Sequence, residues 1–208
     1  MLPIETLITF FTASILLGLA PGPDNIFVMT QAALHGKGPG LIIMLGLCTG
    51  LIGHTLAVAL GVAIIFQSST IAFSVLKLIG AGYLFYLAWQ AFRAPAQTLK
   101  DASIGRINYG KLYRRGIIMN ITNPKVSIFF LAFLPQFTDP SRGPVVFQLL
   151  LLGGLFIIAT IFVFGGIAIL AGTFGQLINQ SDRAQKILSR VAGTVLLGLA
   201  LKLATTEL

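Results

Sequence analysis

Long stretches of this sequence contain no charged residue, which restricts the chain to folds that place apolar helices in a nonpolar environment. No Asp, Glu, Lys or Arg occurs between Glu5 and Asp24, or anywhere in residues 38–76. Only 10% of the 208 residues are charged, against roughly 25% in soluble domains. A helix needs about 20 mostly apolar residues to cross a hydrocarbon core about 30 Å thick. The sequence therefore predicts an all-α polytopic membrane protein.

About six transmembrane helices fit this length. Proline and glycine at positions 21–23 interrupt the first apolar span, and polar residues at 67–70 separate the second from the third. An arrangement of five spans with one re-entrant segment stays open, because the last span carries two charges. The six spans are expected at residues 4–34, 40–66, 71–92, 116–134, 145–174 and 187–206.

The basic residues predict which loops lie in the cytoplasm. Residues 93–115 contain six Lys and Arg residues against the single Asp101. Because cytoplasmic loops retain an excess of Lys and Arg, this central loop is predicted to be cytoplasmic, with both termini outside. The net charge of +8 could also indicate nucleic-acid binding. The basic residues fall between apolar spans, which favours membrane topology instead. We therefore expect the lipid bilayer as a partner and no binding of nucleic acid.

A first candidate site lies where Pro21, Gly22 and Pro23 interrupt the first span. Prolines remove backbone donors and leave carbonyl groups unpaired, and such a break can line a binding site. Asp24 and Asn25 follow directly, and an ionisable group within a span is a functional candidate. The alternative is structural, because Asp and Asn also cap the first turn of helices.

A second polar segment, residues 120–125, lies inside the fourth span. Lys125 lies ten positions beyond Arg115, roughly 15 Å along a helix and near the membrane midplane. Asp24 falls at a comparable depth, so the two side chains are expected to meet or to share a ligand. The candidate residues of this segment are Asn120, Asn123, Pro124 and Lys125.

The two breaks occupy corresponding positions, in the first helix of each half of the chain. Each half has three predicted helices, and the halves would enter the membrane from opposite faces. In transporters, paired proline- or glycine-interrupted segments indicate a binding site near the midplane. We therefore expect two inverted three-helix repeats whose broken first and fourth helices line a substrate or ion site.

Gly46, Gly50 and His54 recur every four residues in the second predicted helix and so share one face. The glycines predict close packing against another helix. His54 is either a hydrogen-bonded packing residue or part of a proton relay. The sequence leaves both interpretations open.

Several classes of function are disfavoured. The sequence has no phosphate-binding glycine loop with the required spacing and no nucleophile with its base. We therefore expect no enzyme activity and no cofactor, with an ion gradient as the driving force. A cation exporter stays as an alternative, although Cys48, His35 and His54 do not form the cluster that a soft metal would need. A membrane scaffold is the third alternative, and the charges beside the breaks argue against it.

The motifs along the chain resemble a known family. They are residues 19–24, Gly46 and Gly50 with His54, residues 77–84, residues 123–125 and residues 133–137. Together they resemble the LysE/RhtB family of amino-acid exporters. The resemblance implies a six-helix protein of the bacterial inner membrane that exports an amino acid in exchange for protons and can form a homodimer. The residues themselves suggest a further hypothesis: Asp24 binds the substrate ammonium or takes the coupling proton, while Lys125 and the half-helix amides bind the carboxylate.

Overall fold

In the part of the chain that it describes, the computed structural model consists of helices joined by short turns, with no strand. This confirms the all-α class for those residues. Most of the predicted sixth helix, at 187–206, lies outside them. The described residues are 2–20, 22–68, 70–93, 107–178, 190, 193–194, 197–198, 200–201 and 204.

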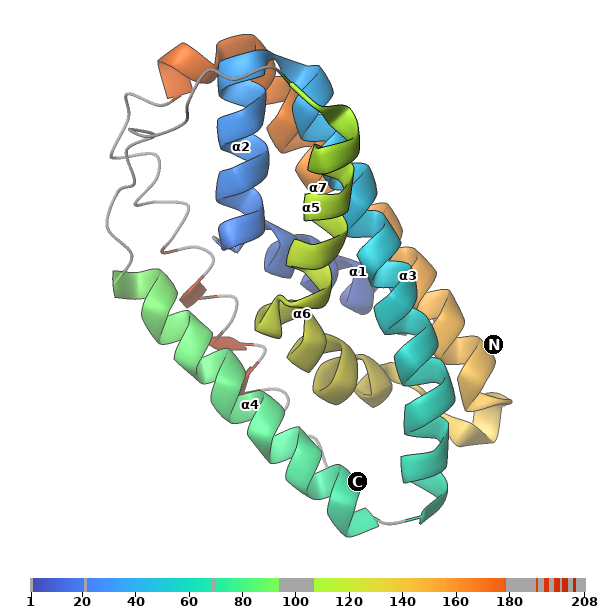
Figure 1. The fold of residues 1–208 in the computed structure, drawn as a ribbon. Helices are drawn as coiled ribbons and strands as arrows, with labels where there is room; N and C mark the ends of the chain where they lie inside the picture. The colour runs from blue at the N-terminus through green and yellow to red at the C-terminus, as the bar shows by residue number, and fades with distance from the viewer. Residues whose placement is uncertain are drawn as a thin grey trace.

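The first apolar segment forms two helices, α1 (Ile4–Leu19) and α2 (Pro23–His35), which meet at 64°. Gly22 between them has extended backbone, with φ of −161°. Pro23 occupies the first turn of α2, where its missing N–H would have no helical partner in any case. Pro21 lies outside the described residues. The break therefore follows from local backbone chemistry, and Figure 1 shows the change of direction.

Two long apolar helices form the centre of the molecule, α3 (Lys37–Ser68) and α7 (Val145–Ile178). They pack against each other along their length. Helix α5 (Tyr109–Ile121) lies against α3, and α1 and α2 lie against α7. Both are long and apolar enough to cross a membrane. If each bent helix pair also counts as one span, the described residues hold up to four spans, so the predicted six are not confirmed.

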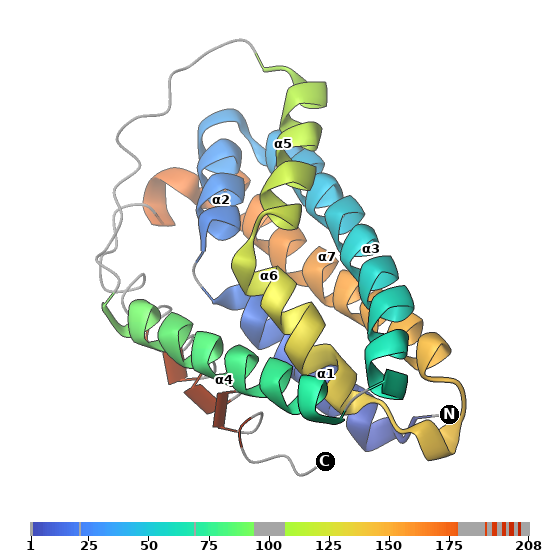
Figure 2. The ribbon, with the colours of Figure 1, turned by 60° about the horizontal axis from the view of Figure 1, so that its bottom comes forward.

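Helix α3 ends at Ser68 and helix α4 (Thr70–Arg93) begins at Thr70, both within the polar segment expected to separate the two spans. The packing partners of α4 include α6 (Pro124–Ile128) and η1 (Phe129–Phe133), which follows α6 in the chain. Figure 2 shows α4 alongside these elements rather than between α3 and α7.

The predicted central loop at 93–115 extends too far, because helix α5 (Tyr109–Ile121) begins within it. The side chain of Asn108 accepts a hydrogen bond from the Lys111 backbone N–H at 2.9 Å and so caps the helix. This cap lets the helix start despite the nearby glycine and charges. Residues 94–106 of the loop lie outside the described residues.

The predicted fourth span, 116–134, is not one continuous helix. After α5 the chain bends by 48° into α6 (Pro124–Ile128), which continues as the π-helix η1 (Phe129–Phe133) and the 3₁₀ helix η2 (Leu134–Phe137). Pro135 lies in the first turn of η2, where its missing N–H is tolerated. Single π-helical turns occur frequently at functional sites.

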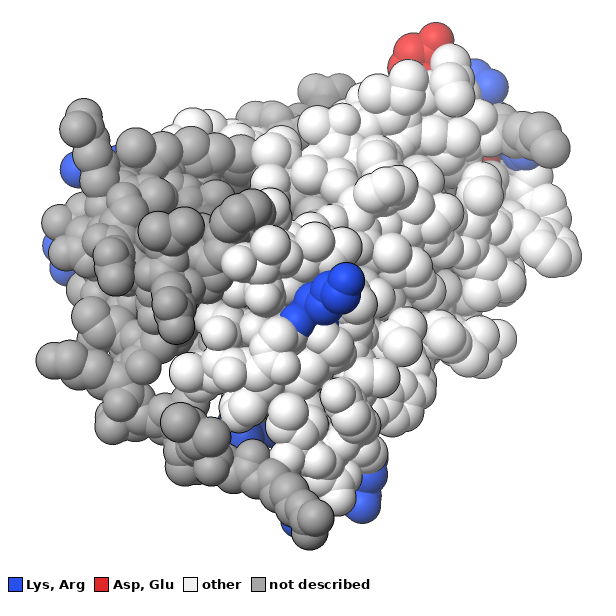
Figure 3. Space-filling view, turned by 90° about the horizontal axis from the view of Figure 1, so that it is seen from above, with Lys and Arg blue, Asp and Glu red and all other residues white. Residues whose placement is uncertain are grey.

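The exposed surface of the long helices is apolar. Leu60 of α3 and Phe162 of α7 are each 67% exposed, and other large apolar side chains of both helices are exposed as well. A soluble monomer rarely exposes apolar surface on this scale. Charged side chains are few and scattered on the face drawn in Figure 3. Together with the two apolar spans, this surface is that of a membrane protein.

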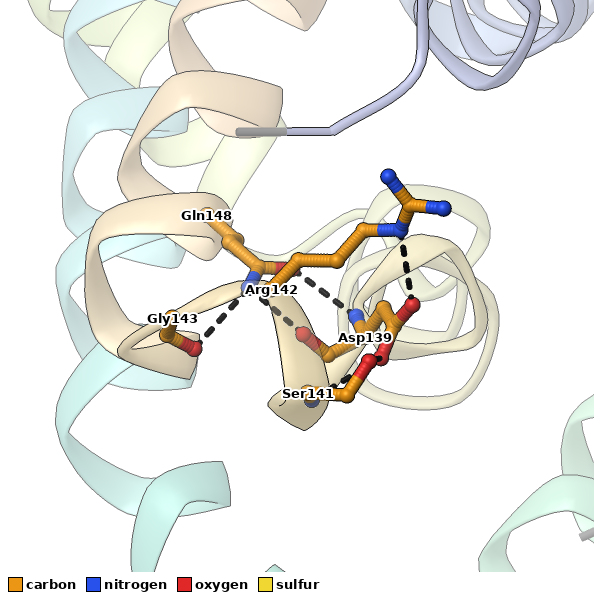
Figure 4. Close-up of polar contacts among 5 residues, drawn as sticks. All are labelled: Asp139, Ser141, Arg142, Gly143 and Gln148. Carbon is orange, nitrogen blue, oxygen red and sulfur yellow. Dashed lines mark hydrogen bonds and ion pairs between the residues drawn. The ribbon is translucent and has the colours of Figure 1, made fainter.

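A hydrogen-bonded turn connects η2 to α7 (Figure 4). The Asp139 carboxylate accepts hydrogen bonds from the Ser141 N–H at 2.9 Å, the Ser141 hydroxyl at 2.6 Å and Arg142 Nε at 3.0 Å. Gln148 of α7 donates to the carbonyls of Asp139 and Gly143 and accepts from the Asp139 N–H at 2.8 Å. The 3₁₀ helix η3 (Pro140–Arg142) is thereby held against the first turn of α7.

This turn should loosen in acid. Hydrogen bonds from the side chain and backbone of Ser141, with Arg142 beside it, lower the pKa of Asp139 below its ordinary value. A carboxyl group whose pKa is lowered by folding stabilises the folded form above its unfolded pKa, about 3.9, and loses this contribution as the pH falls through the lowered value. The amide-exchange protection factor of Ser141, measured by NMR in detergent, should therefore fall in strong acid. Asp139→Ala should show the low protection already at neutral pH. Equal protection of the wild type at both pH values would contradict this role.

Candidate functional site

The two helix breaks meet inside the helix bundle. Asn123, at the start of α6, donates a hydrogen bond from Nδ2 to Oδ2 of Asp24, in the first turn of α2, at 2.6 Å. Asp24 is 2% exposed and Asn123 is 4% exposed. Two segments that lie 99 positions apart in the sequence are thus joined by one buried polar contact.

Lys125 binds the end of α1. Its Nζ donates to the backbone carbonyls of Ala20 at 2.9 Å and of Leu17 at 3.4 Å. Ala20 follows the last residue of α1, and the Leu17 carbonyl also accepts a hydrogen bond from the Ala20 N–H at 3.2 Å. A cation is favourable at such a helix C-terminus. A Cβ at Gly22 would lie 3.2 Å from Lys125 Nζ, so the glycine in the break makes room for the lysine.

Asp24 and Lys125 do not form a direct ion pair. Within the described residues, the pair that approaches within 4.0 Å is Arg142 with Asp139. Asp24 and Lys125 nevertheless line one cavity, whose volume is about 20 Å³. The sequence left two arrangements open, direct contact between the two side chains or a shared ligand. Direct contact is wrong, and the two residues line one cavity instead.

The capping role considered for Asp24 and Asn25 is not found. Residue Gly22 precedes α2, and no side chain caps this helix. Asn25 instead reaches back to α1, where its Nδ2 donates to the Gly18 carbonyl at 2.7 Å. Asn123 is the residue that caps a helix, because its Oδ1 accepts from the Lys125 N–H at 3.0 Å. Asn25 and Asn123 thus hold the two breaks in shape.

The predicted glycine face of α3 packs against α5. A Cβ at Gly46 would lie 2.3 Å from the Tyr113 carbonyl oxygen, and one at Gly50 would lie 2.6 Å from Oδ1 of Asn120. His54 Nε2 lies 3.3 Å from the Asn120 carbonyl oxygen. The small residues therefore allow α5 to approach closely, and His54 contacts the site through the backbone of Asn120.

Thr160 of α7 is a member of the cavity that sequence reasoning missed. It is buried and lines the same space as Asp24, Asn120 and Lys125. The available signal was a hydroxyl residue in the middle of a long apolar span. Apolar side chains complete the wall, among them Leu17, Leu47, Val126, Phe156 and Phe164.

A second, larger cavity of about 400 Å³ opens near the N-terminus, and the sequence did not predict it. Its polar and charged lining residues include Glu5, Gln136, Asp139 and Arg142, with Phe133 on its apolar side. The two cavities share no lining residue.

Aromatic side chains separate the two cavities. Phe133 lines the larger cavity and Phe156 the smaller one, and Phe129 packs between them. Its ring centroid lies 4.8 Å from that of Phe133 and 5.1 Å from that of Phe156. Phe129 and Phe133 belong to the π-helix η1 and are almost fully buried. In this conformation packed rings therefore stand between the polar site and the larger cavity.

The site combines helix breaks, a buried carboxylate and a buried lysine within a helical membrane protein. The LysE type translocator family matches residues 15–207, a range that contains both breaks. This chain belongs to the LysE type translocator family. The predicted family resemblance is therefore confirmed, and the protein is a translocator rather than an enzyme.

Relatives of this translocator cover most of its length. It is 34% identical over 186 residues to a homoserine/homoserine lactone efflux protein of Salmonella typhi, with 89% of each chain covered. The identity and coverage are the same for the protein of that name from Salmonella typhimurium. A membrane protein of Vibrio cholerae is 28% identical over 204 residues, or 98% of each chain. No solved structure matches the chain.

Proposed function

We propose that this translocator exports an amino acid or a close derivative from the bacterial cytoplasm across the inner membrane. The observation that carries the proposal is the buried cavity where Asp24 and Lys125 both face the same space without pairing with each other. A zwitterion carries an ammonium group and a carboxylate, which an anionic acceptor and a cationic donor can bind separately. The efflux of homoserine and its lactone, named for two relatives, supports this substrate class.

The orientation follows from charge. The start of α3, which carries Lys37, and the start of α5, which carries Lys111, lie at the same end of the bundle as the link between α2 and α3. Lys and Arg are retained on the cytoplasmic side, so this end faces the cytoplasm. The larger cavity near the N-terminus then opens to the outside. Substrate would leave through it.

The pairing of helices supports the inverted-repeat arrangement. Helix α1 lies against α7, and α5 lies against α3, so the broken helix of each half packs on the long helix of the other. In transporters built in this way, one repeat rocks against the other around a site at the midplane. The 20 Å³ cavity has room for one small group only, so substrate binding requires such a movement.

Protons are the proposed coupling ion. Asp24 is a buried carboxylate at the site, and one of its oxygens has no hydrogen-bond partner among the described residues. A carboxylate that alternately takes up a proton and a substrate ammonium would couple their opposite movements. The membrane potential contributes about 2.3 kcal/mol per charge and 100 mV to such an exchange.

Counterflow in proteoliposomes tests this function. Vesicles loaded with one unlabelled amino acid should take up the same labelled amino acid well above empty vesicles, and the panel should include homoserine and homoserine lactone. An imposed pH gradient should drive net movement, and a protonophore should abolish it. Absence of exchange for every amino acid tested, in protein shown to be folded, would contradict the proposal. Exchange of divalent cations instead would favour the cation exporter.

A further inference from the structure

Two residues that line the small cavity each carry a buried oxygen atom with no hydrogen-bond partner among the described residues: Oδ1 of Asp24 and Oδ1 of Asn120. Both residues line the cavity, and they are 2% and 3% exposed. Buried polar atoms are nearly always hydrogen-bonded, so each exception needs an explanation. Two acceptors at one cavity indicate a missing donor.

Lys125, the cationic donor that lines the same cavity, already donates to other groups. Its ammonium group has three N–H donors, and two of them are used by the carbonyls of Ala20 and Leu17. One donor therefore remains, enough for a single substrate oxygen. A carboxylate, an ester or a lactone offers such an oxygen equally well.

A primary ammonium group fits the unused acceptors. It carries three N–H donors and a positive charge, which strengthens a hydrogen bond to a carboxylate. The cavity of about 20 Å³ holds one group of this size, since a water molecule needs roughly 10–15 Å³ measured in the same way. The rest of the substrate has to occupy space that opens when the helices move.

Resting on the proposed function, we propose that Asp24 and Asn120 form a subsite for the primary ammonium group of the substrate. Asn120 is thereby a specificity-determining residue that binds substrate and is not only a packing partner of α3. The transported class is then a primary amine with a neighbouring carbonyl oxygen. Analogues in which the amine is acylated or replaced by a hydroxyl group are excluded, whereas a change at the carboxyl end is tolerated.

Competition in the counterflow assay tests the subsite. Vesicles containing the wild-type protein take up labelled L-homoserine in the presence of unlabelled homoserine, homoserine lactone, N-acetylhomoserine or the 2-hydroxy analogue. We expect the last two to compete at least about 10-fold more weakly than the first two, because each loses charge-assisted hydrogen bonds. Equal competition by N-acetylhomoserine would overturn the subsite. Failure of the wild type to exchange any amino acid would instead overturn the proposed function.

Asn120→Ala separates binding from packing. If Asn120 binds the ammonium group, this variant should raise the KM for homoserine and reduce the preference over N-acetylhomoserine, whereas Asn120→Asp, which keeps an acceptor, should retain the preference. A merely structural role would slow uptake of all solutes together and leave the preference unchanged, which would also overturn the proposal. Thr122→Ala, on the exposed side of the same segment, is the matched control and should resemble the wild type.

Discussion

Asp24→Asn should reduce amino-acid counterflow by roughly 10- to 100-fold, because a hydrogen bond to a charged group contributes about 1.5–3 kcal/mol. The substitution keeps the size of the side chain and retains an oxygen within reach of Asn123 Nδ2, which now donates to Asp24 at 2.6 Å. What it removes is the negative charge at the cavity. The loss should therefore appear in transport, measured in proteoliposomes, and much less in the amount of folded protein.

Two further variants show whether the loss of counterflow in Asp24→Asn is specific to the cavity and whether Asp24 only neutralises Lys125. Asp101→Asn makes the same substitution in the segment between the two halves and should leave counterflow near the wild-type rate. The double variant Asp24→Asn with Lys125→Gln should stay inactive, because the two residues are not within ion-pair distance and bind different partners. Restored transport in the double variant would show that the charges only neutralise each other.

Gly46→Ala should destabilise the protein more than any other small substitution on this face of α3. Its Cβ would lie 2.3 Å from the carbonyl oxygen of Tyr113 and 3.0 Å from Cα of Gly116, and both are backbone atoms of α5. Backbone cannot rotate away as a side chain can, so the two helices must separate. Overpacking of this kind costs typically about 1–3 kcal/mol, and occasionally more. A lower thermal unfolding midpoint in detergent is the expected result.

Gly53→Ala is the matched control for this prediction. It makes the same substitution in the same helix, but a Cβ at Gly53 has nothing within 4 Å. Since alanine favours helix over glycine by about 1 kcal/mol, this variant should be at least as stable as the wild type. Equal unfolding midpoints for the two variants would mean that α3 and α5 do not approach as closely as described. Transport should also fall in Gly46→Ala, because α5 carries Asn120 to the cavity.

Features with a local cause were predicted well. The breaks before Pro23 and Pro124 follow from a missing backbone donor, and the apolar spans of α3 and α7 follow from the needs of a hydrocarbon environment. Features that depend on packing between helices were not predicted. The π-helical segment Phe129–Phe133 lies among buried aromatic rings from three parts of the chain, which no local pattern reveals. The early start of α5 depends on a single cap at Asn108, and the surrounding charges and glycines give no local sign of a helix.

The candidate site shows the same difference between local properties and tertiary contacts. The sequence by itself determined that a carboxylate and a lysine stand beside two helix breaks within apolar spans, because residue type and backbone chemistry are local properties. Only the tertiary structure decided which groups they contact. Asp24 accepts from Asn123, and Lys125 donates to the Ala20 and Leu17 carbonyls at the end of α1. Asn120 lines the same cavity and carries a second acceptor with no partner among the described residues. These contacts join residues about a hundred positions apart, so they depend on how closely packed helices approach, and periodicity along one helix cannot specify that distance.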